Sequence, residues 1–351
     1  GVFNRKDKIA VDYETRGRTL VKNDKGEVIG LIAEKDGKKV AYKARKAVVL
    51  CTGGYEYSKT MRQAFLEGPG VEGWAFYGTL YNEGDGIRMG LDAGAGMMKA
   101  GKAASRIIMP APIRHNGLRI GMITPVVGSG HAIVVNQQGK RYAAEHKVTK
   151  DPSRYFFYKE AVRFNIDTLD YANSPSWFIF DETLRKAKPL VGTGISTPGY
   201  ASDNSDAVKK GWILKADSIE ELGKKILEQK DNGGKMDPKV LAETVARYNE
   251  FCKEGEDKDF GRLKSTLQPV AEGPFYAVPL VAGGPNTKGG LAANAKREVL
   301  DWDLKPIPGL YAVGEIASAL KFVYQGGGNL TETLVFGQVC GKIVATLPNR
   351  A

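Results

Sequence analysis

Residues 46–54 read KAVVLCTGG, a nearly continuous apolar run that ends in a threonine and two glycines. Such a run is typical of a parallel strand buried on both faces of its sheet. Glycines directly after a buried parallel strand let a ligand approach the backbone, and open α/β sheets bind nucleotides at this place. The stretch therefore predicts a nucleotide-binding α/β sheet, with Thr52, Gly53 and Gly54 at the ligand.

A second stretch near the other end of the chain repeats this pattern. Residues 309–315 read GLYAVGE, an apolar run closed by Gly314 and Glu315. A carboxylate just past a strand can accept hydrogen bonds from sugar or ribityl hydroxyl groups. We therefore expect Gly314 to permit a close approach and Glu315 to bind hydroxyl groups of the ligand.

Two further glycine-containing stretches precede helical patterns. Residues 326–332 read GGGNLTE, in which Asn329 and Glu332 have the spacing of a capping box. The sequence thus predicts a helix that begins there, and its free N–H groups and dipole would suit an anionic group. The other stretch, Gly84–Ile87, opens a helical segment that we expect to close at Gly94 or Gly96.

Composition narrows the class of protein. The chain has 351 residues, 42% of them hydrophobic and 26% charged, which fits two or three packed domains. No stretch approaches the roughly 20 apolar residues of a membrane span. The 51 Lys and Arg against 40 Asp and Glu are interspersed, which favours a solvated basic surface or an anionic ligand over nucleic acid. Three cysteines and three histidines lack disulfide or metal-ligand spacing, so no metal site is expected.

The remaining pattern divides the chain. Residues 8–50 read as a meander of strands at 8–13, 18–22, 27–34 and 39–44. From about residue 105 the character changes to aromatic residues and Pro-Gly turns, with helical patterns at 218–230 and 237–253. We therefore predict an inserted domain at 105–268. Residues 1–104 and 269–351 would form the two parts of the nucleotide-binding domain.

Five of these stretches carry a family resemblance. In order and spacing, VVLCTGG (48–54), GDGI (84–87), GKRY (139–142), GLYAVGE (309–315) and GGN (327–329) resemble the fumarate reductase/ketosteroid dehydrogenase flavoproteins. The resemblance implies a glutathione-reductase-type α/β FAD-binding domain with an inserted, fumarate-reductase-like α+β capping domain. It implies FAD contacts at Thr52, Gly53, Gly54, Gly84, Asp85, Gly86, Gly289, Gly290, Gly314, Glu315, Gly327, Gly328, Asn329 and Leu330.

Members of this family also begin with a strand and a G-x-G-x-x-G motif that binds the FAD pyrophosphate. That motif is absent here, and residues 192–197 have only two of its glycines. We therefore expect this chain to work with a further amino-terminal segment or with a second chain. The histidine that some relatives use to attach FAD covalently is also absent, so the resemblance implies non-covalent FAD.

The resemblance also bears on the substrate. Fumarate reductases clamp dicarboxylates with a histidine before Gly289 and an arginine two residues before Gly327, but this chain has Pro285 with Asn286, and Gln325. Neutral side chains do not replace that bidentate charge. Residues 324–328, YQGGG, instead resemble the Tyr-x-Gly-x-Gly of ketosteroid dehydrogenases. The catalytic residues implied are Tyr324 and Gly328, whose O–H and N–H would form an oxyanion hole. A Tyr324 buried in the core is the alternative.

A proton donor or acceptor is needed as well. Residues 177–185 resemble the fumarate reductase segment that carries a proton-donating arginine, which implies this role for Arg185, with a solvated helix face as the alternative. Glu145 with His146 matches the start of the fumarate reductase proton relay. Ketosteroid dehydrogenases use capping-domain tyrosines instead, for which Tyr142, Tyr155 and Tyr158 are the candidates.

Together the sequence predicts an FAD-dependent oxidoreductase that reduces or forms a C=C bond conjugated to a carbonyl, by hydride transfer with flavin N5. A ketone or enone substrate, steroid-like in shape, is favoured. Two alternatives stay open: a reductase of an unsaturated carboxylate, and a fragment without activity that completes a flavin site on another chain. No NAD(P) domain is recognisable, so we expect a redox partner protein, a quinone or a second substrate to exchange electrons.

Overall fold

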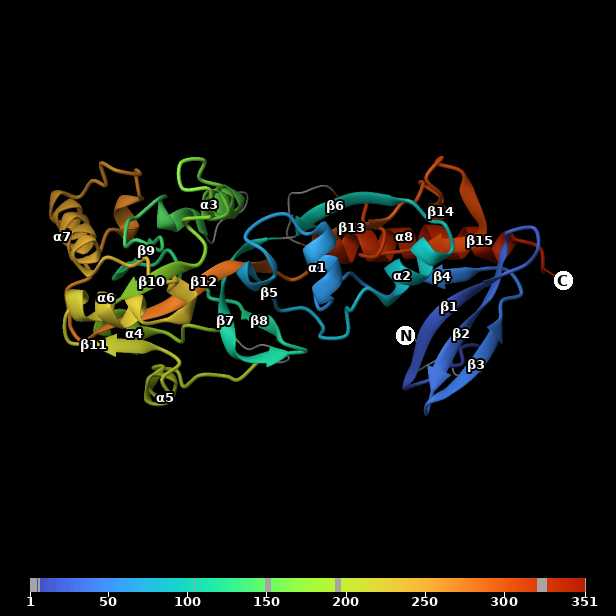
Figure 1. The fold of residues 1–351 in the computed structure, drawn as a ribbon, viewed down its shortest axis with the longest axis horizontal. Coiled ribbons are helices and arrows are strands. Elements are labelled where there is room, and N and C mark those ends of the chain that lie inside the picture. Colours follow the sequence, from blue (N-terminus) through green and yellow to red (C-terminus); the bar gives the residue numbers. More distant parts are fainter. Residues whose placement is uncertain are drawn as a thin grey trace.

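The computed structural model describes residues 5, 7–103, 105–148, 153–192, 197–320 and 327–350. Two lobes lie end to end, and the long strand β12 (Phe275–Gly284) runs from one toward the other (Figure 1). The right-hand lobe contains α1 (Lys59–Phe65), α2 (Asp85–Asp92), α8 (Gly328–Thr346), β1 (Thr15–Lys22), β2 (Val28–Lys35), β3 (Lys38–Lys43), β4 (Val48–Leu50), β6 (Met97–Ala103), β13 (Thr287–Leu291), β14 (Glu298–Leu300) and β15 (Pro306–Ala312).

The two apolar stretches of the sequence form neighbouring parallel strands. β4 pairs with β15 from Val48 opposite Leu310 to Leu50 opposite Ala312, as expected for an α/β sheet. The strand order is β14-β15-β4, so β4 is an edge strand in the described part of the chain. Val49 is consequently 39% exposed, and the expectation that this strand is buried on both faces is wrong at that position.

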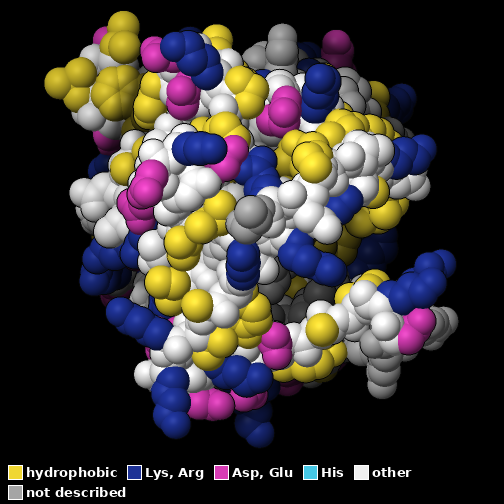
Figure 2. Space-filling model, turned by 90° about the vertical axis from the view of Figure 1, so that its right-hand side faces the viewer, with side chains coloured by type: hydrophobic (Ala, Val, Ile, Leu, Met, Phe, Trp, Pro, Cys, Tyr) yellow, Lys and Arg dark blue, Asp and Glu magenta, His cyan; other side chains and the backbone are white. Residues whose placement is uncertain are grey.

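The predicted meander is a three-stranded antiparallel sheet, β1-β2-β3, with turns at residues 23–26 and 36–37. The strand expected at residues 8–13 is wrong, because the first strand begins at Thr15. The apolar side chains of that stretch, Ile9, Val11 and Tyr13, are exposed, so they have no core face that would fix them in a ladder. Lys and Arg side chains are spread over this end of the molecule among hydrophobic and acidic ones (Figure 2).

The left-hand lobe is built on a seven-stranded sheet of order β5-β8-β7-β12-β10-β9, with β11 paired to β12. Strand β10 contacts a hydrophobic cluster on each face of this sheet, and all five of its residues are buried. Trp177 and Ile179 pack on one face, in a cluster with residues of α6 and α7, while Phe178 and Phe180 pack on the other. The lobe's elements are β5 (Trp74–Phe76), β7 (Arg106–His115), β8 (Leu118–Met122), β9 (Ala132–Val135), β10 (Ser176–Phe180), β11 (Leu214–Ala216), α3 (Ser153–Ala161), α4 (Glu182–Ala187), α5 (Ser205–Lys209), α6 (Ile219–Leu227) and α7 (Pro238–Glu254).

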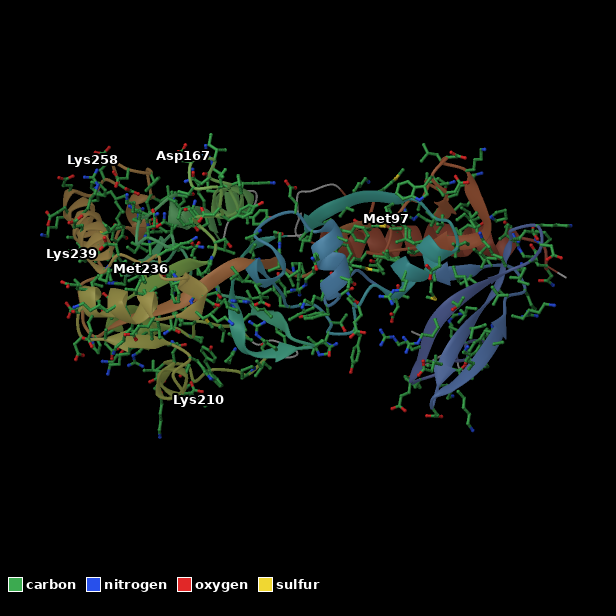
Figure 3. The ribbon with its side chains drawn as sticks, viewed as in Figure 1. Met97, Asp167, Lys210, Met236, Lys239 and Lys258 are labelled. Atoms are coloured by element: carbon green, nitrogen blue, oxygen red, sulfur yellow. The ribbon has the colours of Figure 1, made fainter. Side chains whose placement is uncertain are left out.

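This sheet joins all three predicted ranges of the chain. β5 comes from the first range, β7 to β11 from the second and β12 from the third. The division at residues 104 and 268 therefore stays a prediction. The helices expected at 218–230 and 237–253 are present as α6 and α7. Lys239 and Lys258 lie at the end of this lobe that is farthest from the other lobe, and Lys210 projects from its lower edge (Figure 3).

The structure can be inspected for membrane-spanning helices, disulfides and metal sites. In the described residues no helix is long and apolar enough to cross a membrane. The three cysteines are free thiols. Within the same described ranges, no cluster of His, Cys, Asp and Glu has the arrangement of a metal site.

Candidate functional site

The glycine stretches predicted to bind FAD lie side by side, and their lack of side chains makes this possible. A Cβ atom on Gly54 would lie 2.2 Å from Oε1 of Glu315 and 2.2 Å from Oγ1 of Thr287. One on Gly86 would lie 2.1 Å from Oγ1 of Thr52. These distances are far below van der Waals contact, so the strand ends of β4 and β15 and the start of α2 meet at one place.

Two more glycines complete this arrangement. Gly53 has φ 74°, and a Cβ there would lie 2.3 Å from Oδ1 of Asn82. Gly290, at φ 140°, sits with its backbone against Ile316, the residue after Glu315. The predicted contacts at 52–54, 84–86, 289–290 and 314–315 are therefore brought together as a set.

Glu315 occupies the centre of the set. Its Oε2 accepts a hydrogen bond from Nδ2 of Asn82 at 3.4 Å, and its Oε1 lies 3.3 Å from the Thr287 hydroxyl. Burial, and then the nearby carboxyl group of Glu56, raise the pKa of Glu315 well above its ordinary value. The acid past β15 thus lies where the sequence predicted a ligand-binding carboxyl group.

Glu56 is a site residue that the sequence prediction missed. Its side chain is fully buried, and Oε1 accepts a hydrogen bond from the backbone N–H of Thr287 at 2.6 Å. Its Oε2 is buried without a hydrogen-bond partner among the described residues. Two carboxyl groups, Glu56 and Glu315, therefore lie on either side of Thr287.

A buried lysine marks the other side of the site. Lys288 is 1% exposed, and its Nζ donates to Oδ1 of Asn329 at the start of α8. Burial lowers the pKa of Lys288. Nδ2 of Asn329 in turn donates to Oδ1 of Asn286 at 2.6 Å. The three side chains form a chain of hydrogen bonds from β13 to the helix.

Helix α8 starts two residues earlier than predicted. Gly327 is its N-cap at φ 77°, without a side-chain cap, and the first helical hydrogen bond runs from Thr331 N to Gly327 O. The predicted capping box at Asn329 and Glu332 is wrong, because Asn329 binds Lys288 and Glu332 accepts from Ser318 at 2.9 Å. A glycine that adopts a left-handed conformation begins the helix without such a cap.

The start of α8 nevertheless offers free backbone N–H groups, as the sequence predicted. The N–H groups of Gly328, Asn329 and Leu330 precede the first acceptor available inside the helix, so they are free to face a ligand. They border a cavity of about 270 Å³. Its lining includes Gly78, Thr79, Asn82, Pro285, Asn286, Glu315, Asn329, Leu330, Glu332 and Thr333. The cavity, the free N–H groups and the glycine cradle fit a polar, partly anionic cofactor.

The predicted contact at Asp85 has a different environment. Its carboxylate is bound by the guanidinium of Arg16, with nitrogen–oxygen distances of 2.6 and 2.9 Å. Arg16 also pairs with Glu83 at 2.5 Å. Both acids line a second cavity of about 660 Å³, which also reaches Thr52. The role of Asp85 toward FAD stays a prediction.

The predicted catalytic residues divide into three cases. Tyr324 lies outside the described residues, and Gly328 is the first residue of α8. Arg185, on α4, is engaged by Glu182 at 2.6 and 2.8 Å and by the backbone oxygen of Asp203 at 2.6 Å. Arg185 is buried and held by these contacts, so the alternative of a solvated helix face is wrong, and its catalytic role stays a prediction.

The other proton-transfer candidates lie in the left-hand lobe. Glu145 is fully buried and binds Arg141 through two hydrogen bonds of 2.7 Å. Arg262 lies 3.4 Å from the same carboxylate. Removing one partner of such a buried cluster would leave an uncompensated charge, so these contacts hold Glu145 in place. Tyr142 binds Ser176 at 2.6 Å, while Tyr158 packs near Trp74, and burial raises its pKa to about 12.

The missed residues have a common signal in the sequence. Glu56 follows Gly54 by two residues, Asn82 precedes Gly84 by two, and Thr287 and Lys288 directly precede Gly289. Polar residues within two positions of a ligand-binding glycine were therefore the signal available. Their pairing across more than two hundred residues required the folded chain.

Comparisons with known proteins agree with this geometry. The sequence profile of the family described as "FAD binding domain" matches residues 3–330. A probable fumarate reductase of Shewanella frigidimarina is 31% identical over 329 residues, which are 93% of this chain and 48% of the relative. This chain spans about half the length of the first curated relatives that it matches.

Solved structures give the same picture. A 3-ketosteroid Δ1-dehydrogenase from Sterolibacterium denitrificans, in complex with 1,4-androstadiene-3,17-dione, superposes with a TM-score of 0.73 at 25% identity, over 94% of this chain and 59% of that chain. The open conformation of a flavocytochrome c3 fumarate reductase superposes with a TM-score of 0.65 at 27% identity. This match covers 98% of this chain and 54% of that chain. The predicted fold class, an FAD-binding α/β fold with a capping domain, is confirmed.

Proposed function

This chain belongs to the FAD binding domain family, and on that premise we propose that it is part of an FAD-dependent oxidoreductase that forms or reduces a C=C bond conjugated to a carbonyl. The observation that carries the proposal is the close approach of Gly54 to Glu315, together with the cavity that Glu315 and the free start of α8 both line. FAD, when bound, supplies the hydride acceptor or donor.

The residues of this chain would hold the cofactor without a covalent bond. Gly53 and Gly54 give the backbone room for it, Glu315 offers acceptor oxygens to its hydroxyl groups, and the first N–H groups of α8 face its anionic edge. Acid precipitation should then release the flavin into solution. Flavin that stays in the protein pellet would contradict this assignment.

A ketone or enone substrate is favoured over a dicarboxylate. Asn286 stands where fumarate reductases have a clamping histidine, and its side chain is already bound to Asn329 and to the backbone oxygen of Thr287 at 2.8 Å. In this proposal Tyr324 and the N–H of Gly328 bind the ketone oxygen. The substrate comparison is an anaerobic assay with a reduced dye, a cyclic enone and fumarate.

A reductase of an unsaturated carboxylate is the second candidate. The probable fumarate reductase of Shewanella frigidimarina, at 31% identity, supports it. Lys288 is a buried cation near the start of α8, but its ammonium group is bound to Asn329. Efficient turnover of fumarate without turnover of the enone would decide for this candidate.

The proposed enzyme includes a polypeptide segment beyond these residues. β4 is an edge strand in the described part of the sheet, and α8 exposes Leu330 by 69%, Leu334 by 62% and Val335 by 50%. An open strand edge next to an apolar helix face is the surface onto which a βαβ unit packs. We assign that unit the pyrophosphate motif absent from this chain. A separate redox protein would deliver or accept the electrons.

A further inference from the structure

The relationship between Glu56 and Glu315 implies a bound proton. Oγ1 of Thr287 lies 3.3 Å from Oε1 of Glu56 and 3.3 Å from Oε1 of Glu315. A hydroxyl group has a single proton to donate, so it cannot serve both acceptors at once. Both carboxyl groups thus lie beside the same hydroxyl group, and the nearby Glu56 helps to raise the pKa of Glu315. Two ionised carboxylates would repel one another there.

The contacts indicate which of the two carries the proton. The backbone N–H of Thr287 donates to Oε1 of Glu56 at 2.6 Å, so this oxygen acts as an acceptor. Among the described residues, Glu315 has longer contacts, to Asn82 at 3.4 Å and to Thr287 at 3.3 Å. An O–H group on Glu315 would supply the donor that Oε2 of Glu56 lacks among the described residues.

The other charged and titratable groups around the pair fit this assignment. Arg62, a buried cation on α1, lies beside Glu56, and its Nε donates to the backbone oxygen of that residue. Tyr55 and Tyr57 flank Glu56 and are raised in pKa by burial, so they stay neutral. Lys288 is the cation nearest to Glu315, but its Nζ is bound to Asn329.

We propose that Glu56 is a positioning residue that keeps the carboxyl group of Glu315 protonated, so that a neutral carboxyl group binds the cofactor. The inference rests on the proposed function, because it concerns how the same site takes FAD. A cofactor in the cavity would remove water from Glu315, and this desolvation favours the neutral form further. A neutral group also avoids repulsion with the negative charge that a flavin gains on reduction.

Infrared spectroscopy tests the proton directly, without cofactor. The wild-type chain at pH 7 should show the carbonyl stretch of a protonated carboxyl group, and Glu315→Gln should remove it. Glu56→Gln should also remove it, because the new amide can donate to Glu315 and leave it ionised. Glu250→Gln, on the exposed face of α7, is the control and should leave the band in place. A wild-type spectrum without this band would overturn the proposal.

FAD titration provides the second test. Wild-type affinity should be constant at low pH and then fall, by up to about tenfold per pH unit, as the pH rises through the raised pKa of Glu315 and this residue loses its proton. Glu315→Gln is neutral at every pH and should bind within about threefold of wild type at pH 7, without that fall. A loss of about tenfold or more in Glu315→Gln at pH 7 would show that a charged carboxylate is required. If the wild-type chain bound no FAD even in the presence of the segment that carries the pyrophosphate motif, the proposed function would fail, and the infrared result alone would decide the protonation.

Discussion

The buried ammonium group of Lys288 donates a hydrogen bond to the side chain of Asn329, which joins β13 to the first turn of α8. A buried cation is unfavourable for the fold, but this one fixes an asparagine beside the cavity. Its lowered pKa reflects that burial. We therefore expect that Lys288 lowers the stability of the fold and strengthens the binding of the cofactor.

Lys288→Met should raise the melting temperature and weaken FAD binding by about tenfold. The thioether removes the burial cost of the charge, whereas Asn329 loses a charge-assisted hydrogen bond of about 1.5–3 kcal/mol. Thermal unfolding and FAD titration measure the two effects. Lys296→Met, on an exposed turn, is the control. Loss of stability together with unchanged FAD affinity would contradict the role assigned to Lys288.

Glu56→Gln should stabilise the chain in a pH-dependent manner. Because the folded-state pKa of Glu315 is raised, the native state keeps a proton that the unfolded chain releases above about pH 4.3. The free energy of unfolding therefore falls as pH rises from that value through the folded-state pKa. Removing the neighbouring charge lowers that pKa toward its ordinary range and reduces the loss.

The measurement is the difference in melting temperature between Glu56→Gln and wild type. It should be near zero at about pH 4 and reach about 2 °C or more at about pH 8. Glu250→Gln should show no such trend. A difference that stays constant with pH would argue against a protonated Glu315.

Gly54→Ala should destabilise the site by steric overlap. Its Cβ would lie 2.2 Å from both Glu315 and Thr287, whose side chains are held by hydrogen bonds, and the expected cost is about 1–3 kcal/mol. Gly341→Ala, in the interior of α8 with no atom within 4 Å of the new Cβ, should instead stabilise the helix by about 1 kcal/mol. Thermal unfolding of both variants makes the comparison. Equal melting temperatures would mean that Gly54 is not a close-approach position.

Much of this site could be predicted because it depends on local pattern. The runs ending at Gly54 and Glu315 predicted two parallel strands, and β4 and β15 are paired as expected. Adjacent parallel strands bring their carboxyl ends together, so these two segments had to meet. Glycine positions need no knowledge of distant partners, because a buried strand and a small residue after it are both visible in the sequence.

The remainder depends on contacts between distant residues. No local pattern indicates that Glu56 lies near Glu315, 259 positions away, because the two carboxyl groups come together only in the folded chain. The predicted start of α8 is wrong because Asn329 and Glu332 have capping-box spacing, whereas the helix begins at Gly327. The left-handed conformation of this glycine is seen only in the structure. The stretch at residues 8–13 alternated like a strand but lacked a core face. An alternating pattern alone does not make a strand, because the strand also needs neighbouring residues against which its side chains pack.

The exposed face of α8 should bind apolar dyes. Leu330, Leu334 and Val335 are exposed along the first turns of this helix, which forms a patch of the kind found at interaction surfaces. Leu334→Asp should lower dye fluorescence and self-association, with a change in stability within about 0.5 kcal/mol. Leu263→Asp, at an exposed leucine in the other lobe, should have the smaller effect. Similar dye binding in both variants would count against an interaction surface on α8.

Tyr324→Phe addresses the substrate. If the Tyr324 hydroxyl donates to a ketone oxygen, its removal should lower turnover of an enone by about 100-fold or more, and the retained ring should preserve the packing. Tyr13→Phe, at a residue 64% exposed, is the control.

Gln325→Arg alone should not create fumarate reduction, because Asn286 offers a bound amide in place of a cation. If the wild type reduces fumarate efficiently and Tyr324→Phe leaves that rate unchanged, the ketone assignment is wrong. A cation of the left-hand lobe would then have to hold the carboxylate, and Arg185, freed from Glu182 by a Glu182→Gln substitution, is the first to test.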